Sequence, residues 1–368
     1  MKKSCRLVTI DRPVVVCGNG ALNQLERFLS SNRMNREKIF ILTDRETHRH
    51  CLPVLLSASG ILDQAKYLTV AGGEESKTLE TAAGLWEQML AAGADRNSLL
   101  VNLGGGVVSD LGGFVAACFH RGIRYVNIPT SLIGQADASI GGKTGINLGR
   151  IKNQIGVFCN PAAIFIDPVF LTTLPRTHLR SGWAEVIKCT LTGDERLWSR
   201  LVNHPVEALV ELPVNDRLIE HVISNTVDYK LMLVKKDFRE RNLRKILNFG
   251  HTLGHAFETF SMGRQGESLL HGEAIAAGMI CAVMLSRLKT GLDPAEGDKI
   301  IRYLQAGYGK FSIGTTDVEQ LLQIVGHDKK RRNGAIEFTL LTRPGKAKIQ
   351  VPCREEEIVQ AVRFYQDL

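Results

Sequence analysis

The sequence predicts an α/β domain with a mainly parallel sheet over residues 1–174, followed by a mainly helical domain over residues 175–368. Strand-like and helix-like patterns alternate in the first half, and this alternation is typical of a parallel sheet covered by helices. Beyond Pro175 the β-rich runs largely stop and long amphipathic segments follow. With 368 residues, of which 44% are hydrophobic, the chain is large enough for two such domains.

The elements follow one another in a regular order. Short β-rich runs predict strands over residues 39–43, 98–103, 125–128 and 163–166. Helical spacing of apolar residues predicts intervening helices over residues 78–92 and 110–119. The same spacing predicts helices in the second domain over residues 182–191, 213–233, 243–259 and 272–288, with a Gly/Ser-rich connection at 261–268.

Composition limits the classes of function. A formal charge of +8 could indicate a nucleic-acid surface, but only 6% of residues are aromatic and the one basic block is residues 329–332. An anionic small molecule explains the charge at least as well, so we expect no nucleic-acid partner.

No apolar run reaches the ~18–20 residues of a membrane span. The amino-terminal segment lacks the apolar core of a signal peptide, and the eight cysteines include no CxxC pair, which together predict a cytoplasmic protein.

A glycine triplet, Gly104-Gly105-Gly106, follows the second predicted strand and precedes a helix that Ser109 or Asp110 could cap. Such a turn lets the backbone approach a pyrophosphate and presents free N–H groups, although an ordinary tight turn would have the same pattern. The spacing differs from G-x-G-x-x-G, which disfavours a standard Rossmann domain.

Three charged residues precede this turn in the chain. Asp44 ends the first predicted strand and is placed like a carboxylate that binds an adenosine ribose. Glu74 and Lys77 could do similar work, although helix-capping residues look much the same.

A second glycine-rich stretch contains Lys143 within Gly-Gly-Lys-Thr and is followed by Lys152 and Asn153. The upstream glycine is not at the spacing of a P-loop, so we reject that interpretation. What remains is a lysine held between glycines, which favours the binding of an anion.

Histidines and a carboxylate form a possible metal site. Glu185 and Lys188 are three residues apart on a predicted helix, which fits a surface ion pair, but their neighbours are apolar enough for a metal-binding carboxylate. His251 and His255 have zincin spacing without the zincin glutamate, and His271 follows sixteen residues later. One carboxylate and two imidazoles with open positions make a catalytic zinc site. Histidines held by backbone groups are the alternative.

The predicted helix over residues 243–259 carries further polar groups. Steps of four, three and four residues place Arg244, Asn248, His251 and His255 on one face of that helix.

These motifs together resemble the 3-dehydroquinate synthase family over nearly the whole chain. They are Gly-Gly-Gly-Val-x-x-Asp, Gln-x-Asp-x-Ser-x-Gly-Gly-Lys-Thr, Ala-Glu-Val-Ile-Lys, Asn-x-Gly-His-Thr-x-Gly-His and Leu-His-Gly-Glu. The resemblance implies a dehydroquinate synthase-like fold with an NAD-binding first domain. It also implies a carbon-oxygen lyase of the shikimate pathway to chorismate and the aromatic amino acids. In that reaction 3-deoxy-D-arabino-heptulosonate 7-phosphate undergoes transient NAD-dependent oxidation, β-elimination of phosphate, reduction and intramolecular aldol cyclisation to 3-dehydroquinate.

The resemblance also implies roles for individual residues. The metal, zinc or alternatively cobalt, is bound by Glu185, His251 and His271. Nucleotide contacts include Asp44, Glu74, Lys77, Gly104, Gly105, Gly106, Asp110, Thr130, Ser131, Lys143 and Lys152. Substrate contacts include Asp137, Lys143, Asn153, Lys188, Lys230, Arg244, Asn248, His255 and either Lys329 or Lys330. The family implies a homodimer, with Arg121 approaching the phosphate site across its interface.

Three alternatives remain. A sister sugar phosphate cyclase would act on a different sugar phosphate, whereas the retained Arg244, Asn248 and Lys230 favour a substrate with a carboxylate. Glycerol-dehydrogenase-like enzymes share the fold but are not expected to keep the Gly-Gly-Lys-Thr and Lys-Asn motifs. A non-catalytic binding protein would be expected to lose part of the metal set, and all three residues are present.

Overall fold

The computed structural model describes residues 6–9, 13–32, 35–149, 151–264, 268–314, 316–328 and 335–368, with backbone alone for 6–9 and 327–328. The described chain divides into two compact units. The first unit runs to Pro175 and also contains Pro213–Arg239, and the second contains Arg176–Leu212 and Glu240–Leu368. Residues 213–239, which the sequence pattern assigns to the helical domain, therefore group with the first unit.

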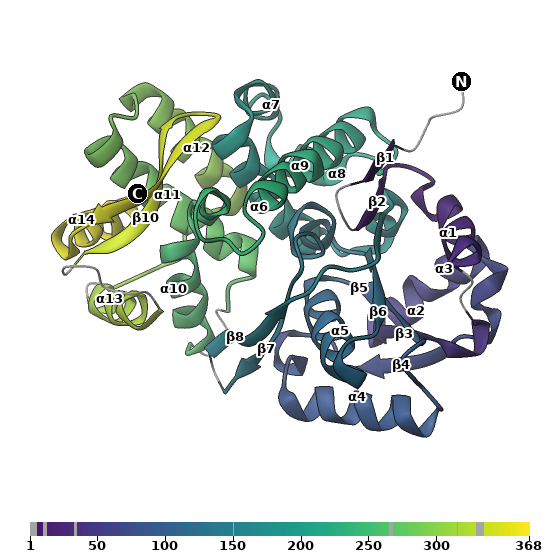
Figure 1. Ribbon diagram of the computed structural model, residues 1–368. Helices are drawn as coiled ribbons and strands as arrows, with labels where there is room; N and C mark the ends of the chain where they lie inside the picture. The colour runs from purple at the N-terminus through teal and green to yellow at the C-terminus, as the bar shows by residue number, and fades with distance from the viewer. Residues whose placement is uncertain are drawn as a thin grey trace. The chain divides into compact units, whose positions relative to one another are not determined.

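A sheet of seven described strands forms the centre of the first unit, in the order β1-β2-β9-β6-β5-β3-β4 (Figure 1). The strands are β1 (Arg6–Thr9), β2 (Val14–Cys17), β3 (Ile39–Asp44), β4 (Lys66–Val70), β5 (Leu99–Gly104), β6 (Arg124–Pro129) and β9 (Ala163–Ile166). Only β1 pairs in the antiparallel sense, with β2. The pairings among β2, β9, β6, β5, β3 and β4 are all parallel, which confirms the predicted sheet.

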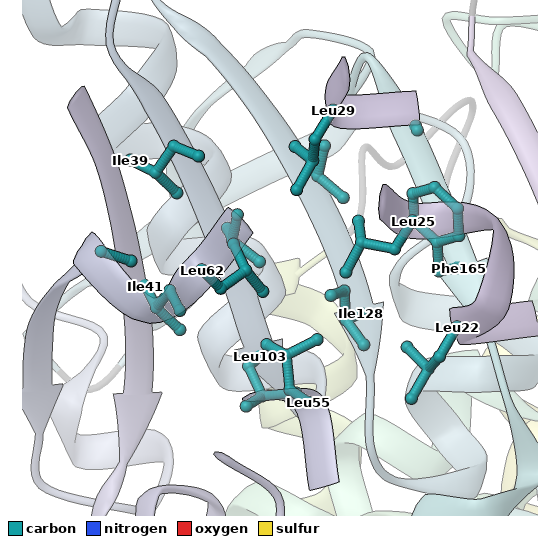
Figure 2. Packing of buried hydrophobic residues seen from close by; sticks show 14 of the residues in the cluster. Leu22, Leu25, Leu29, Ile39, Ile41, Leu55, Leu62, Leu103, Ile128 and Phe165 are labelled. Carbon is teal, nitrogen blue, oxygen red and sulfur yellow. The ribbon is translucent and has the colours of Figure 1, made fainter. Parts of the chain in front are cut away.

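Alternating side chains of the central strands build two cores, one on each face of the sheet. On β3, Ile39 and Ile41 belong to one buried cluster, whereas Phe40 and Leu42 belong to the other. Figure 2 shows the first cluster, where residues of β3, β5, β6 and β9 meet leucines from the segments around α1 (Leu25–Ser31) and α3 (Leu52–Ala58). Strands buried on both faces are nearly continuous apolar runs, which is why the sequence pattern located them well.

Helices and a hairpin complete the first unit. The further helices are α2 (Arg45–His50), α4 (Leu79–Ala91), α5 (Gly106–Cys118) and α9 (Arg217–Lys236), and the hairpin consists of β7 (Lys143–Leu148) and β8 (Ile151–Phe158). Short 3-10 turns are η1 (Ala21–Gln24), η2 (Arg36–Lys38), η3 (Gly60–Gln64), η4 (Glu74–Ser76), η5 (Phe119–Arg121) and η7 (Pro168–Thr173). The turn η6 (Gly134–Ala138) has π-helical geometry.

The second unit is mainly helical, as predicted. Its elements are α6 (Arg176–Gly193), α7 (Glu195–Leu201), α8 (Val206–Glu211), η8 (Leu243–Asn248), α10 (His251–Met262), α11 (His271–Thr290), α12 (Pro294–Tyr308), α13 (Asp317–Asp328), β10 (Ile336–Arg343), β11 (Lys346–Cys353) and α14 (Glu355–Asp367). The β10–β11 hairpin departs from the expectation that strands largely end before this region (Figure 1).

The single helix predicted over residues 243–259 is wrong. Residues Leu243–Asn248 form a 3-10 segment, the chain turns at Phe249–Gly250, and α10 begins at His251. Gly250 has a left-handed φ of +79°, which interrupts a right-handed helix. Arg244 and Asn248 therefore do not share one continuous helix face with His251 and His255. No described helix of the chain has both the length and the apolar character needed to cross a membrane.

Candidate functional site

The carboxyl ends of three neighbouring parallel strands gather the predicted nucleotide-binding residues in the first unit. Asp44 ends β3, Gly104 ends β5, and Thr130 directly follows β6. From β3 the chain proceeds to β4 on one side of the sheet, and from β5 it proceeds to β6 on the other. The carboxyl ends of β3 and β5 thus form a topological switch point, which is where open α/β sheets bind ligands.

The glycine turn leads directly into α5. Gly105 is the N-cap and Gly106 the first helical residue, so the expectation that Ser109 or Asp110 caps this helix is wrong. A Cβ on Gly105 would lie 3.1 Å from Ser131 Oγ, and one on Gly106 would lie 3.2 Å from Ala138 Cβ. The turn has little room for side chains, and the first N–H groups of α5 have no intrahelical partners. This arrangement suits a pyrophosphate.

Asp44 stabilises the start of α2 at this same edge of the sheet. Its Oδ1 accepts a hydrogen bond from Thr47 N at 2.8 Å, and Asp44 N donates to Thr47 Oγ1 at 2.9 Å. This reciprocal capping box fixes the carboxylate at the end of β3.

Lys77 brings several predicted site residues together. Its ammonium group lies 2.9 Å from Asp110 Oδ2, 3.5 Å from Glu74 Oε1 and 2.5 Å from Asn153 Oδ1. The Lys77 side chain is only 3% exposed. Burial alone would lower its pKa, but the carboxylates of Asp110 and Glu74 outweigh burial and raise the pKa above the usual value. Lys77 therefore stays charged and ties α5 and the β7–β8 hairpin to the turn around residues 74–77.

Asn147 is a residue of this network that the sequence reasoning missed. Its Nδ2 donates to Glu74 Oε1 at 3.0 Å and to Glu74 O at 3.1 Å, and its Oδ1 accepts from Asn153 N at 2.9 Å. Its own N–H donates to Lys77 O at 2.7 Å. Asn153 has a left-handed φ of +54°, and Asn147 fixes that residue at its backbone N–H. The five residues between Asn147 and Asn153 span a hairpin turn, and no local sequence pattern signals that these two residues pair.

Lys230 and Asp137, two further predicted substrate contacts, bind each other elsewhere in the first unit. Lys230 of α9 is buried and donates to both the carboxylate and the backbone carbonyl of Asp137. Asp137 lies in the π-helical turn η6, and such turns occur frequently at functional sites. Lys143 begins β7 and is exposed, while Lys152 lies near the start of β8.

Three possible metal ligands converge in the second unit. Glu185 lies on α6, His251 is the first residue of α10, and His271 is the first residue of α11. Glu185 Oε1 lies 3.4 Å from His251 Nε2 and 3.2 Å from His271 Nε2. Tetrahedral ligands ~2.0–2.1 Å from a zinc ion are about 3.3 Å apart, so both separations suit that ion. The donor set of one carboxylate and two imidazoles therefore fits a catalytic zinc or cobalt ion.

Glycine contacts explain why α10 and α11 can place these histidines together. A Cβ on Gly278 of α11 would lie 2.1 Å from Gly250 O and 2.4 Å from Gly254 N. Only glycine at position 278 allows the two backbones to approach so closely. The contact packs the start of α10 against α11, so that the rings of His251 and His271 have centroids 5.9 Å apart.

Hydrogen bonds to side chains fix the start of α11 against α6. Gly272 N donates to Ser181 Oγ at 2.9 Å. Glu273 accepts from Leu270 N at 2.9 Å and from Arg180 at 2.5 Å. Since Ser181 and Glu185 are one helical turn apart on α6, these bonds also set the position of His271 relative to Glu185.

The electrostatics of this cluster favour a cation. Glu185 is fully buried, and burial alone would raise its pKa, but Lys188 and His251 hold the pKa well below its usual range. Burial lowers the pKa of His251 to about 4, whereas hydrogen bonds to Glu185 and Glu258 overcome burial and raise that of His271 to about 10. The pocket thus stabilises positive charge between Glu185 and His271, and a divalent ion would supply such charge.

Glu258 is a second residue that the sequence reasoning missed. It lies on α10, three residues after His255, and its Oε2 is within 3.4 Å of Nδ1 atoms from both His255 and His271. The spacing of His255 and Glu258 on one helix was the available signal, since residues three apart face the same side.

The remaining predicted residues of this unit are in or near η8. Arg244 is buried, and Asn248 Nδ2 donates to Glu240 Oε1 at 2.9 Å. Lys188 is also buried and pairs with the other oxygen of Glu185. Lys329 and Lys330 lie outside the described residues.

Comparisons with known proteins agree with these features. Residues 67–181 match the family model of the 3-dehydroquinate synthase amino-terminal domain, and residues 182–331 match that of the carboxyl-terminal domain. A 3-dehydroquinate synthase of Parabacteroides distasonis is 37% identical over 357 residues, covering 97% of this chain and 98% of that protein.

Two solved structures have a similar fold. A 2-deoxy-scyllo-inosose synthase in complex with carbaglucose-6-phosphate, NAD+ and Co2+ has a TM-score of 0.84 at 24% identity, with 98% of this chain and 100% of that chain covered. A 2-epi-5-epi-valiolone synthase from Streptomyces hygroscopicus subsp. jinggangensis 5008, with NAD+ and Zn2+ bound, has a TM-score of 0.83 at 26% identity, with 99% of each chain covered. With both family models matched in succession and a close relative covering nearly its full length, the chain belongs to the 3-dehydroquinate synthase family.

Proposed function

We propose that the chain is an NAD- and metal-dependent lyase that converts 3-deoxy-D-arabino-heptulosonate 7-phosphate to 3-dehydroquinate and phosphate, a step of the shikimate pathway. The observation that carries this proposal is the convergence of Glu185, His251 and His271 in a member of this family. A catalytic metal site keeps positions open for substrate, and three protein ligands leave such positions.

Glu185, His251 and His271 would hold the metal ion, and the glycine turn before α5 would hold the pyrophosphate of NAD. When bound, NAD accepts and later returns a hydride while the metal ion polarises the alcohol that is oxidised, which acidifies the neighbouring C–H for loss of phosphate. The turn offers backbone N–H groups, whereas Asp44 at the adjacent strand end would accept hydrogen bonds from a ribose.

Cationic side chains would bind the phosphate and carboxylate of the substrate. We assign this work to Lys143, Lys152 and Lys230 in the first unit and to Lys188 and Arg244 in the second. Fixed positive charges stabilise developing negative charge strongly when little reorganisation is needed. The burial of Lys188, Lys230 and Arg244 supports this assignment, because buried cations are restricted in orientation.

Neutral and acidic groups would orient the sugar and move protons. Asn153 and Asn248 can donate and accept hydrogen bonds to hydroxyl groups. Asp137 is fixed by Lys230, and His255 is fixed by Glu258 while its side chain remains 39% exposed. Either Asp137 or His255 could relay a proton, since both can exchange one at a defined position.

We further propose, as the family resemblance implies, a homodimer in which Arg121 reaches a neighbouring phosphate site. His120 and Arg121 both have left-handed backbones, with φ of +49° and +67°. Such conformations cost about 1–3 kcal/mol per residue and occur often at functional sites. Removing the guanidinium in Arg121→Ala should raise the KM for substrate with little change in unfolding free energy.

A direct assay tests the proposed function. The purified chain is incubated with the heptulosonate phosphate, catalytic NAD and zinc, and phosphate and the carbocyclic product are measured together. We expect equal amounts of both products and no net NADH. Release of phosphate only from the corresponding sugar phosphate without a carboxylate would instead identify a sister cyclase, and no release from either would contradict the proposal.

A further inference from the structure

The carboxylate of Glu258 lies between two histidines with different proposed tasks. Its Oε2 is 3.3 Å from His271 Nδ1 and 3.4 Å from His255 Nδ1. The opposite ring nitrogen of His271, Nε2, is 3.2 Å from Glu185 Oε1. Glu258, the His271 ring and Glu185 thus form a continuous chain of contacts.

The surroundings of Glu258 distinguish it from a surface ion pair. Its side chain is 6% exposed, whereas an ordinary pair of residues three apart on a helix lies in solvent. A carboxylate in this position accepts the N–H of a histidine and leaves the other ring nitrogen with its lone pair for a metal. The His251 ring has a different partner, because its Nδ1 lies 3.2 Å from the backbone oxygen of Phe249.

We propose that Glu258 is a positioning residue that fixes the tautomer and ring orientation of the metal ligand His271 while holding His255 through the same oxygen. This inference rests on the proposed function, because it takes His271 as a metal ligand. By accepting both Nδ1–H groups, Glu258 directs both Nε2 atoms away from itself. The proposed metal ligand His271 and the proposed substrate contact His255 are thereby held by the same carboxylate oxygen.

The same three residues could alternatively bind a second metal ion, since His255, Glu258 and His271 also have ligand atoms close to one another. That arrangement would use Nδ1 of His271 for one ion and Nε2 for another, and would leave no proton on the imidazole. A carboxylate that accepts two N–H groups satisfies the same distances without this requirement. The two accounts differ in metal stoichiometry and in the protonation of Nδ1.

The test measures zinc affinity by competition with a chelator, without substrate, in the wild-type chain and in Glu258→Gln and Glu258→Ala. We expect affinity to fall about 10–100-fold, with the larger loss in Glu258→Ala, because outer carboxylates of metal-bound histidines have effects of this size. Asp317→Asn is the matched control: Asp317 is a buried carboxylate of the same unit that pairs with Arg264. Wild-type affinity in both Glu258 variants would overturn the proposal.

Two further measurements distinguish positioning of His271 by Glu258 from a general loss of stability and from a second metal site. The visible spectrum of the cobalt-loaded Glu258→Gln chain should shift, whereas that of Asp317→Asn should match wild type. Nitrogen NMR of the zinc-loaded wild-type chain, which needs no folded variant, should show a protonated Nδ1 on His271. An unprotonated Nδ1, or two tightly bound ions per wild-type chain with one lost in Glu258→Gln, would contradict the assignment. If the Glu258 variants weaken zinc binding as expected but the wild-type chain does not turn over the heptulosonate phosphate, only the proposed function would be refuted.

Discussion

Lys77 Nζ lies 2.9 Å from Asp110 Oδ2, so the predicted nucleotide contacts Lys77 and Asp110 bind each other across the first unit. The lysine comes from the turn after β4 and the aspartate from the second turn of α5. This pair of a buried lysine and a partly exposed aspartate gives both residues a structural role in addition to any contact with NAD.

A double-mutant cycle measures how much the Lys77–Asp110 pair contributes to the free energy of unfolding. Lys77→Met should lower the unfolding free energy by about 3 kcal/mol, the lower end of the range for breaking a buried pair, because Asp110 stays partly exposed. Adding Asp110→Asn should recover part of the loss, since the uncompensated carboxylate is then gone. Urea unfolding of the four chains gives the coupling energy. Strictly additive losses would show that the pair is energetically unimportant.

Asn147 offers a separate test of the same network. Asn147→Ala should cost about 0.5–1.5 kcal/mol of unfolding free energy, because Glu74 and the exposed Asn153 backbone lose a hydrogen-bond partner. NAD affinity should fall as well, since the 74–77 turn is no longer fixed. Calorimetric titration with NAD and urea unfolding check both effects, with Asn203→Ala, an exposed asparagine, as control. Unchanged NAD affinity would show that the hydrogen bonds of Asn147 do not contribute to nucleotide binding.

The contact between α6 and α11 predicts a strong effect at Gly272. A Cβ there would lie 1.9 Å from Ser181 O, and a backbone atom cannot move aside as a flexible side chain can. Gly272→Ala should therefore displace the start of α11, weaken zinc binding and lower the unfolding free energy. Gly84→Ala is the matched control, because its Cβ would meet nothing within 4 Å and alanine favours a helix interior by about 0.5–1 kcal/mol. Wild-type zinc affinity in Gly272→Ala would show that this contact does not position His271.

Much of the fold was readable from the sequence because its strands are buried on both faces. The run Ile39-Phe40-Ile41-Leu42 supplies alternate residues to two cores and is apolar throughout. The break before His251 was not readable, because helical spacing continues through Gly250. A single sequence shows neither the left-handed backbone at Gly250 nor the close approach of α11, and both require that glycine. The alternation at Ile336, Phe338 and Leu340 is typical of a strand, and the eight-residue β10 was missed although this signal was present.

The candidate metal set was readable because its members lie in distinctive motifs, and the structure brings all three together. Glu258 and Asn147 were missed for a common reason. Each acts on a predicted site residue through a hydrogen bond, to His271 or to Asn153, and a single sequence does not reveal such pairs. Their partners are 13 and 6 residues away and become neighbours only through the connection to α11 and the hairpin.

Lys188 separates metal binding from substrate binding. Its ammonium group pairs with Glu185, so Lys188→Met removes a cation that competes with the metal for this carboxylate. Zinc affinity should be retained, whereas kcat/KM should fall roughly 100–1,000-fold if the ammonium group stabilises negative charge on the substrate. Lys299→Met on the exposed face of α12 serves as control. A turnover equal to that of wild type would exclude Lys188 from the chemistry.

The Glu185→Gln variant tests the central claim most directly. Metal content is determined by mass spectrometry, and phosphate release from the heptulosonate phosphate is followed with NAD and zinc present. The exposed Glu211→Gln is the control for the same chemical change. We predict that Glu185→Gln binds NAD but retains no tightly bound zinc and shows no turnover. One zinc ion per chain together with wild-type turnover in this variant would contradict the account.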